Sequence, residues 1–331
     1  MSSPLRLGVL GAARIAVVAL AEPVATTGDR MVAVAARDRG RAETFAAEHG
    51  VERVHDTYDA VLADPEVEVV YVPLANGLHG RWTRAAIEAG KHVLVEKPFA
   101  SNADEAREVA AAARAAGVVV VEAFHHVHHP VTRRLVSLLP ELGELRRIET
   151  TFRMPAPSGD DPRWSFDLAG GALMDLGCYA LHLQRWLAGA EPVVERASGT
   201  ERSPGVDASM TADLVFAPGV TGRASCDMAA DSWTITARVI GSRGEATALN
   251  VVLPHQDDRI VVTVDGEERT EHLGTRSTYT YQLEALRAHL REGAPFPLDL
   301  DDAVAQAELV DAVYAAAGFP PRPRTEPVAA S

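Results

Sequence analysis

The chain has 331 residues, more than the roughly 250–300 that one hydrophobic core usually supports, and this length suits two domains. Apolar residues make up 47% and charged residues 24%, which excludes a disordered chain, and no apolar run reaches the roughly 18 residues of a membrane span. The 32 basic and 46 acidic residues give a net charge of −14, which disfavours nucleic acid as a partner. Two cysteines, Cys178 and Cys226, are too few for a disulfide framework. With no secretory signal ahead of the first apolar run, we expect a cytoplasmic protein.

The first 125 residues alternate apolar runs typical of strands with stretches of helical spacing. The predicted strands are Leu5–Leu10, Met31–Ala36, Val67–Val72, His92–Val95 and Val118–Glu122, and the predicted helices are Ala13–Thr27, Arg39–Glu48, His79–Ala89 and Asn102–Ala115. Repeated βαβ units are typical of a doubly wound parallel sheet that helices cover. We therefore predict an α/β protein whose residues 1–124 form a Rossmann dinucleotide-binding domain.

The pattern changes after residue 125. Two helices are predicted there, Val131–Leu139 and Leu173–Leu187, and two more, Tyr281–Arg291 and Leu300–Ala317, near the end. Between them lie strands separated by turn residues: Leu145–Met154, Ala208–Phe216, Thr221–Met228, Trp233–Gly241, Glu245–Val251 and Ile260–Val264. This arrangement predicts a C-terminal α+β domain over residues 125–331 with a large, mostly antiparallel open sheet.

A glycine turn follows the first predicted strand. Gly11-Ala-Ala-Arg-Ile-Ala16 stands where a Rossmann protein has G-x-G-x-x-G/A, with Ala13 in place of the glycine that approaches the pyrophosphate. After the second strand, Ala36 takes the place of the acidic residue that binds the ribose of NAD, and Arg37 and Arg41 follow. Guanidinium groups suit a 2′-phosphate, so we predict a site that prefers NADP(H), with NAD(H) as the alternative. Arginines that are only solvated surface residues would give the same pattern.

Two further groups of residues carry reactive side chains. Glu96-Lys97-Pro98 directly follows an apolar strand, at the edge where doubly wound sheets bind ligands, and an ammonium there needs a partner or a function. Asp175 and Tyr179 are four residues apart on a predicted helix and therefore share one of its faces. The alternatives to catalysis are a structural ion pair at Lys97 and a buried tyrosine satisfied by a carboxylate.

Taken in order, these motifs resemble the glucose–fructose oxidoreductase and inositol dehydrogenase family (Gfo/Idh/MocA), in particular the branch with dimeric dihydrodiol dehydrogenase and NADP-dependent xylose dehydrogenase. The resemblance runs from about Leu5 to about Pro321. Beside the glycine turn and the Arg37 region, it rests on Asn76–His79, Ala89–Pro98, Glu122–Phe124, Leu142–Glu144, Gly170–Tyr179 and Tyr281–Glu284.

The resemblance implies an oxidoreductase that transfers a hydride to or from a secondary alcohol or ketone of a sugar, cyclitol or cyclic diol. It implies catalytic roles for Lys97, Tyr179 and Asp175. The implied cofactor contacts are Gly11, Ala12, Ala13, Arg14, Ile15, Arg37, Arg41, Leu74, Asn76, His79, Glu96 and Lys97, and the implied substrate contacts are Phe124, His126, Arg163, Asp175 and Tyr179. A phenol with a pKa near 10 is poorly matched to neutral pH, so the Lys97 ammonium would assist Tyr179.

Two alternative functions stay open. A non-catalytic NADP-binding sensor would not need Lys97 or Tyr179, and both are present. A sugar–sugar oxidoreductase with tightly bound NADP would be expected to carry an arm ahead of the first strand.

The segment His125–His129 departs from the family pattern, which has an arginine at Val127. We predict no metal there, because neighbouring histidines converge poorly on one ion.

We expect a homodimer or a higher homo-oligomer that forms through the C-terminal sheet. In the family that the sequence resembles, the outer face of this sheet is the subunit contact. Pairing of two identical sheets about a two-fold axis gives a closed assembly. The following residues are more than one buried face would absorb: Val239, Ile240, Val251, Val252, Ile260 and Val262. The other expected partner is a small polyol or keto-sugar substrate, and no membrane partner is expected.

Overall fold

The computed structural model describes residues 3–325, which form two compact units. The first unit contains the chain up to Phe124 and takes in Tyr279–Val304 and Arg324–Thr325 near the end, while the second contains His125–Thr278 and Ala305–Pro323. The first boundary coincides with the expected limit at residue 124. The return of the chain to the first unit differs from the expected division, which assigned every later residue to the second domain. Among residues 3–325, no helix has the length and apolar content needed to cross a membrane.

Ion pairs explain why a late helix, α9 (Thr278–Glu292), contributes to the first unit. The Arg287 guanidinium lies 3.1 Å from both carboxylate oxygens of the buried Asp29, and Arg291 pairs with Glu68. Strand and helix periodicity does not reveal such partners, because more than 200 residues separate them in the chain.

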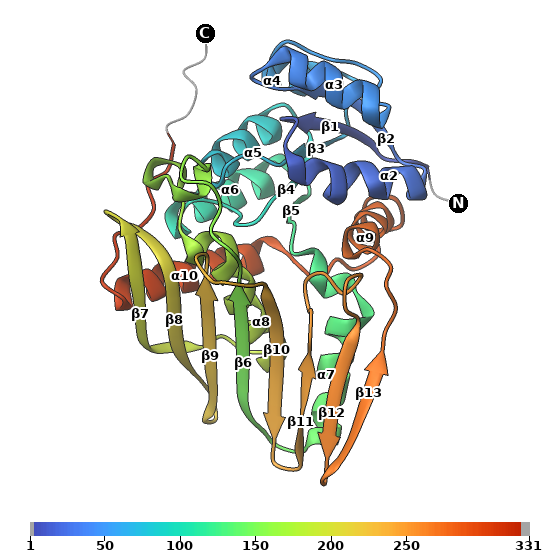
Figure 1. The fold of residues 1–331 in the computed structure, drawn as a ribbon. Coiled ribbons are helices and arrows are strands. Elements are labelled where there is room, and N and C mark those ends of the chain that lie inside the picture. Colours follow the sequence, from blue (N-terminus) through green and yellow to red (C-terminus); the bar gives the residue numbers. More distant parts are fainter. Residues whose placement is uncertain (1–2, 326–331) are drawn as a thin grey trace. The chain divides into compact units, whose positions relative to one another are not determined.

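The first unit is built on a five-stranded parallel sheet with the order β2-β1-β3-β4-β5 (Figure 1). Its strands are β1 (Arg6–Leu10), β2 (Arg30–Ala35), β3 (Val69–Val72), β4 (His92–Val95) and β5 (Val120–Glu122). Most of their residues are buried on both faces, as expected of a parallel sheet covered by helices. The strand order reverses between β1 and β3, and ligands bind at the carboxyl ends of the strands at such a switch point.

The helices of this unit agree with the prediction except in two places. They are α1 (Arg14–Ala16), the π-helix η1 (Val17–Ala21), α2 (Glu22–Thr27), α3 (Arg39–His49), α4 (Tyr58–Ala63), the 3₁₀ turn η2 (Asn76–Leu78), α5 (His79–Glu88) and α6 (Ala103–Ala116). The first predicted helix contains a π-helical turn, and α4 was not predicted because six residues are too short for a helical period to stand out.

The second unit is built on an eight-stranded sheet with the order β13-β12-β11-β10-β6-β9-β8-β7. All neighbouring strands are antiparallel except β6 and β9. The strands are β6 (Leu145–Arg153), β7 (Val193–Ser203), β8 (Val206–Phe216), β9 (Val220–Asp227), β10 (Thr234–Gly241), β11 (Gly244–Ala248), β12 (Arg259–Val264) and β13 (Glu267–His272). The edge strands β7 and β13 were not predicted individually, because they are largely exposed and lack apolar alternation.

Helices α7 (Pro130–Leu142) and α8 (Cys178–Ala188) pack against one face of this sheet (Figure 1). Helix α8 packs on β6 and β9, and α7 packs on β10, β11 and β12. The remaining elements are the 3₁₀ turns η3 (His125–His128), η4 (Pro162–Trp164) and η5 (Phe166–Leu168), the π-helix η6 (Leu173–Gly177) and α10 (Leu300–Ala316).

The expectation that these apolar residues exceed what one buried face can absorb is wrong. Val239, Val251, Ile260 and Val262 are fully buried within the single chain and Val252 is nearly so, while Ile240 is partly exposed. Alternation along a strand shows which of its residues share a face of the sheet, but it does not show how much of that face α7 covers. The predicted homodimer therefore rests on the family resemblance and not on unburied apolar side chains.

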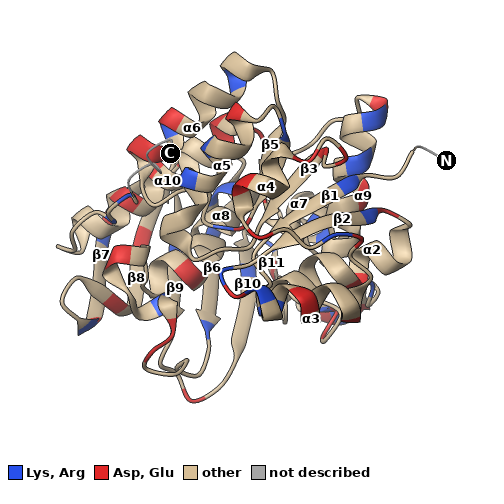
Figure 2. Cartoon of the chain, turned by 90° about the horizontal axis from the view of Figure 1, so that it is seen from above, with Lys and Arg blue, Asp and Glu red and all other residues tan. Residues whose placement is uncertain are grey.

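The face of the sheet opposite α8 carries charged residues in register across the strands. Asp213 of β8 pairs with Arg223 of β9 at 3.0 Å, and Glu149 of β6 pairs with Arg238 of β10 at 3.2 Å. Acidic and basic positions both occur along these strands in Figure 2. Because opposite charges alternate from strand to strand, cross-strand attraction supports the register.

A fully buried ion pair lies in the core of the second unit. Arg322 Nη2 is 2.6 Å from Asp207 Oδ1, and neither side chain is exposed. Tyr314 Oη donates to the same oxygen at 2.8 Å, and Asp207 Oδ2 accepts the Leu173 N–H at 2.7 Å. The Arg322 Nε–H donates to Gly170 O at 2.7 Å. The pair thus connects β8, α10 and the start of the helix that follows Gly170.

We predict that Asp207→Asn destabilises the protein by about 3–5 kcal/mol, because it leaves the Arg322 charge buried without a counter-charge. Asp213→Asn is the matched control: it is the same substitution on the same strand, but its arginine partners are solvent-exposed, and a loss of at most about 1 kcal/mol is expected. Urea unfolding followed by circular dichroism measures both. Equal losses in the two variants would contradict the importance of the buried pair.

Candidate active site

The glycine turn after β1 has the backbone that a dinucleotide site requires. Gly11 has a φ of +104°, and its N–H donates to Ala35 O at 2.7 Å, so the turn is tied to the end of β2. A Cβ at this position would lie 3.0 Å from Leu74 Cδ2. A side chain would therefore be strained here and would crowd the loop after β3. Ala12 and Ala13 complete the turn, and the helix begins at Arg14.

Two arginines follow β2 close to this turn. Arg41 Nη2 donates to Ala12 O at 2.9 Å, and Arg37 is exposed. The nearby Asp38 carboxylate caps α3 by accepting the Arg41 N–H at 2.9 Å, so it is engaged at the helix terminus. Burial raises the pKa of Tyr58, and the charges of Arg37 and Arg41 partly oppose this rise. Sequence analysis missed Tyr58 because it lies in the short helix α4.

His79 connects the loops after β3 and β4. Its Nδ1 lies 2.7 Å from Pro98 O and its Nε2 lies 2.9 Å from Leu74 O. Burial, with a smaller contribution from the Lys97 charge, lowers the pKa of His79 to about 4. At neutral pH the ring is uncharged and has one N–H, which donates to one of these two carbonyl oxygens, while the other ring nitrogen only contacts the second. The buried His79 ring thus lies between the backbones of the two loops, while Asn76 and Leu74 are partly exposed.

Buried carboxylates hold the segment around Lys97. Glu96 is buried and accepts a 2.7 Å hydrogen bond from Tyr71 Oη, and Glu122 accepts the Phe99 N–H at 2.8 Å. The Lys97–Pro98 peptide bond is cis. Lys97 itself is only partly buried. Lys97 thus lies in a segment that hydrogen bonds hold on both sides, at Glu96 before it and at Phe99 after it.

In the second unit, Asp175 and Tyr179 lie where a π-helical turn, η6, passes into α8. The wider π turn means that the two side chains are not stacked as on a regular α-helix, and such turns are frequent at functional sites. Two glycines precede the turn. A Cβ at Gly170 would lie 2.5 Å from Arg163 O, and one at Gly171 would lie 2.0 Å from Asp207 Oδ1. Glycine is therefore required at both positions, because the Arg163 carbonyl leaves no room for a Cβ at Gly170 and the buried ion pair leaves none at Gly171.

Arg163 connects two acidic residues of this unit. Its guanidinium makes two 2.9 Å contacts with Asp161 and lies 3.5 Å from Asp175 Oδ2. Hydrogen bonding to Asp161 is the largest of the effects that raise the pKa of Arg163. The structure thus brings together two of the predicted substrate contacts, Arg163 and Asp175. Phe124, another predicted contact, is fully buried.

Tyr179 is surrounded by aromatic rings. Its ring is parallel to that of Phe152, with centroids 5.9 Å apart, and the His126 ring lies at 5.5 Å. Burial, and then the charges of His182, His125 and His128, lower the pKa of His126 well below its ordinary value. His125 Nε2 lies 3.1 Å from the Tyr179 hydroxyl. Sequence analysis did not select His125, although its departure from the family pattern was a signal.

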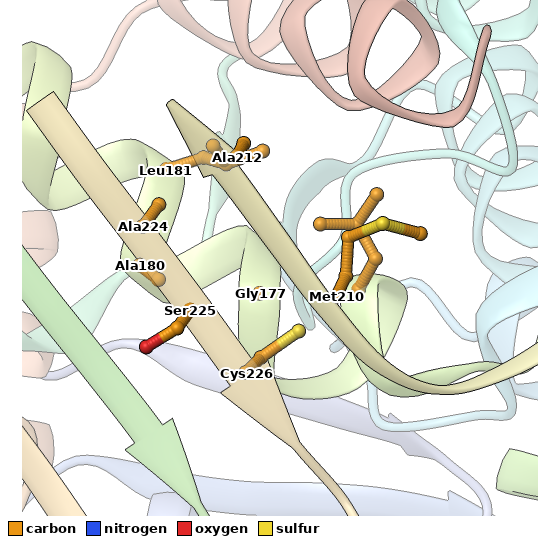
Figure 3. Close-up of a pocket in the computed structure, with 9 residues that line it drawn as sticks. Gly177, Ala180, Leu181, Met210, Ala212, Ala224, Ser225 and Cys226 are labelled. Carbon is orange, nitrogen blue, oxygen red and sulfur yellow. The ribbon is translucent and has the colours of Figure 1, made fainter. Parts of the chain in front are cut away.

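A small pocket lies between η6 and strands β8 and β9 (Figure 3). Its volume is about 10 Å³, room for at most one water molecule. Gly177, Ala180, Met210 and Cys226 are among its lining residues (Figure 3), and burial raises the pKa of the Cys226 thiol. The pocket is a packing gap behind the helix and has no room for a sugar. Among residues 3–325, no three His, Cys, Asp or Glu side chains are grouped as metal ligands would be.

Comparison with protein families identifies both parts of the chain. Residues 5–124 match the oxidoreductase family with an NAD-binding Rossmann fold, and residues 140–247 match the GFO/IDH/MocA C-terminal domain. The chain belongs to the Gfo/Idh/MocA oxidoreductase family. The predicted family and fold class are confirmed, as is the prediction of an enzyme.

Individual Gfo/Idh/MocA proteins resemble the chain over nearly its whole length. D-xylose 1-dehydrogenase (NADP(+)) 2 of Haloferax volcanii is 34% identical, with 94% of this chain and 96% of that protein covered. A dTDP-3,4-didehydro-2,6-dideoxy-alpha-D-glucose 3-reductase of Streptomyces violaceoruber is 34% identical, with 95% of each covered. A 3-ketoreductase from Actinomadura kijaniata, crystallised with NADP and TDP-benzene, superposes with a TM-score of 0.88 at 28% identity, covering 95% of this chain and 98% of its own.

We predict that Gly11→Ala raises the dissociation constant of NADPH by at least ~10-fold, because the added methyl strains a positive φ and crowds the turn that a pyrophosphate approaches. Gly28→Ala is the matched control, since Gly28 also has a positive φ (+76°) but no atom within 4 Å of its added Cβ. Quenching of tryptophan fluorescence by NADPH measures both variants. If both bind NADPH equally well, the turn at Gly11 is not the nucleotide site.

Proposed function

We propose that the protein is an NADP(H)-dependent oxidoreductase that interconverts a secondary alcohol and a ketone on a sugar or a related cyclitol or cyclic diol. The observation that carries the proposal is Lys97, held beside the buried Glu96 at the end of β4 in an NAD-binding Rossmann domain. The names of the relatives support the substrate class, because they are a D-xylose dehydrogenase and reductases of a keto-sugar nucleotide.

The preference for NADP(H) follows from the charges after β2. Arg37 and Arg41 supply guanidinium groups, which can bind a phosphate in a bidentate manner. The carboxylate that NAD-binding proteins aim at the ribose has no equivalent at Ala36, and Asp38 is engaged at the start of α3. NAD(H), which has no 2′-phosphate, gains nothing from these cations and is the weaker ligand.

A bound nicotinamide supplies or accepts the hydride at its C4 position. In reduction, the Tyr179 hydroxyl donates a proton to the substrate oxygen as negative charge develops there, and in oxidation the phenolate removes that proton. The Lys97 ammonium donates a hydrogen bond to the same oxygen and stabilises both the alkoxide and the phenolate. Asp175 accepts a hydrogen bond from a neighbouring substrate hydroxyl, and its contact with Arg163 orients it.

We predict that Lys97→Met lowers kcat by at least ~100-fold, because contacts to a developing oxyanion are usually worth that much. NADPH binding should stay within a few fold of wild type. Lys91→Met is the matched control: Lys91 is the other lysine of the chain and donates to the backbone carbonyls of Asp64 and Val67. It should change stability and leave kcat within twofold. Absorbance at 340 nm with D-xylose and other pyranoses measures turnover, and retained activity in Lys97→Met would reject the mechanism.

We predict that replacing Arg37 and Arg41 together by alanine raises the KM for NADPH at least ~10-fold more than the KM for NADH, since charge-assisted hydrogen bonds to the phosphate are lost. Arg39→Ala is the control, because Arg39 pairs with Glu43 and Asp56 on the surface of the same segment. Initial rates with each nucleotide give the ratio. Equal weakening of both nucleotides would show that the two arginines only support the fold.

A further inference from the structure

Three side chains of the second unit form a continuous hydrogen-bonded series. Thr278 Oγ1 lies 2.6 Å from His125 Nδ1, and His125 Nε2 lies 3.1 Å from Tyr179 Oη. His125 and Thr278 are fully buried, and Tyr179 is 7% exposed. His125 and Thr278 are also the first and last residues of the long segment that forms this unit, so the series joins its two ends to α8.

A neutral imidazole has one nitrogen that donates and one that accepts, so the direction of the hydrogen bond at Nδ1 decides what Nε2 offers. When the Thr278 hydroxyl donates to Nδ1, the Nε2–H donates to Tyr179 Oη. The phenolic proton is then available to the substrate. In the opposite tautomer Nε2 accepts that proton, and Tyr179 cannot donate it elsewhere.

We propose that His125 is a positioning residue for Tyr179, in which the Thr278 hydroxyl fixes the tautomer that donates from Nε2 to the phenolic oxygen. In the reductive direction, the proton passes from Tyr179 to the substrate oxygen, and the remaining phenolate keeps the hydrogen bond from His125. The phenolate regains a proton from water after product release. This inference rests on the proposed acid/base role of Tyr179 and adds two residues to it.

Other titratable groups surround this pair. His126 and His128 belong to the same 3₁₀ turn as His125, His182 lies on α8 and Asp175 lies one turn before Tyr179. The pKa of His126 is far below its ordinary value and burial lowers that of His128 to about 4, so both are neutral at neutral pH. Their neutrality means that they contribute no charge to the ionisation of Tyr179 at or above pH 7.

The first experiment measures the ionisation of Tyr179 without any substrate. The protein has six tyrosines, and ¹³C labelling at Cζ, with Tyr179→Phe to assign the signal, follows this phenol by NMR. His125→Leu should raise its ionisation midpoint by about one pH unit, because the phenolate loses a charge-assisted hydrogen bond. Thr278→Val should shift the midpoint in the same direction by less, and Thr278→Ser should restore the wild-type value.

The second experiment measures turnover of D-xylose with NADP⁺ across pH. His125→Leu should lower kcat at least ~10-fold and move the rising limb of the profile to higher pH, with the KM for NADP⁺ within about threefold. His128→Leu is the control on the same 3₁₀ turn, and it should alter stability without moving the profile.

A folded His125→Leu variant with an unshifted Tyr179 midpoint would overturn the inference and leave His125 as a packing residue. If His125→Leu does not fold, Thr278→Val decides: an unshifted midpoint overturns the proposal, and a shift that Thr278→Ser reverses supports it. The proposed function fails separately. If Tyr179→Phe keeps wild-type turnover, the proton does not come from Tyr179, and the role of His125 falls with it.

Discussion

The buried ion pair between Asp207 and Arg322 restrains the start of the helical segment η6–α8, which carries Asp175 and Tyr179. A carboxylate and a guanidinium removed from water are costly unless their hydrogen-bonding capacity is met. Here the partners that meet it are the Leu173 N–H, the Tyr314 hydroxyl and Gly170 O. Leu173 is the first residue of η6 and Gly170 lies three residues before it, whereas Tyr314 lies on α10. The electrostatic requirement of the pair is thus also the restraint that aligns Asp175 and Tyr179.

The same pair explains a motif that would otherwise read as a flexible hinge. Gly171 has a φ of +128°, and the space of its missing Cβ is filled by the Asp207 carboxylate and the Arg322 guanidinium. Gly170 gives its space to the carbonyls of Arg163 and Ser165. Glycine is therefore used here for close packing, and the turn is rigid because both neighbours are themselves bonded.

In the first unit, neutral and acidic side chains hold the loops at the ends of the strands. Buried Glu122 accepts the N–H that follows the cis proline, Glu96 accepts from Tyr71, and the uncharged His79 ring lies within hydrogen-bonding distance of a carbonyl in each neighbouring loop and donates to one of them. Each loop at this edge is fixed by a side chain from another strand or helix. Lys97 is consequently presented by a backbone that has little freedom to move.

The sequence predicts those features that depend on neighbours in the chain. Apolar alternation locates most strands, and the glycine turn, Lys97 and Tyr179 stand out within short motifs of neighbouring residues. It does not reveal pairs formed across long separations, such as Asp207 with Arg322 or His125 with Tyr179, which are 115 and 54 residues apart. Nor does periodicity reveal a π turn, since one extra residue per turn leaves the helical pattern of its neighbours intact.

The histidine segment shows how a local pattern acquires meaning only in three dimensions. Successive residues of a 3₁₀ turn point about 120° apart, and the rings of His125 and His126 approach Tyr179 from different directions, with centroids 5.9 and 5.5 Å from its ring. One ring bonds to the Tyr179 hydroxyl, and the next packs against the edge of the tyrosine ring. The Phe152 ring lies parallel to that of Tyr179, so three rings surround the phenol, and His125 is the one within hydrogen-bonding distance of its oxygen. Packing against Phe152 and His126 restrains the Tyr179 ring, whereas the contact with His125 is made by the hydroxyl, so these neighbours act on different parts of the same side chain.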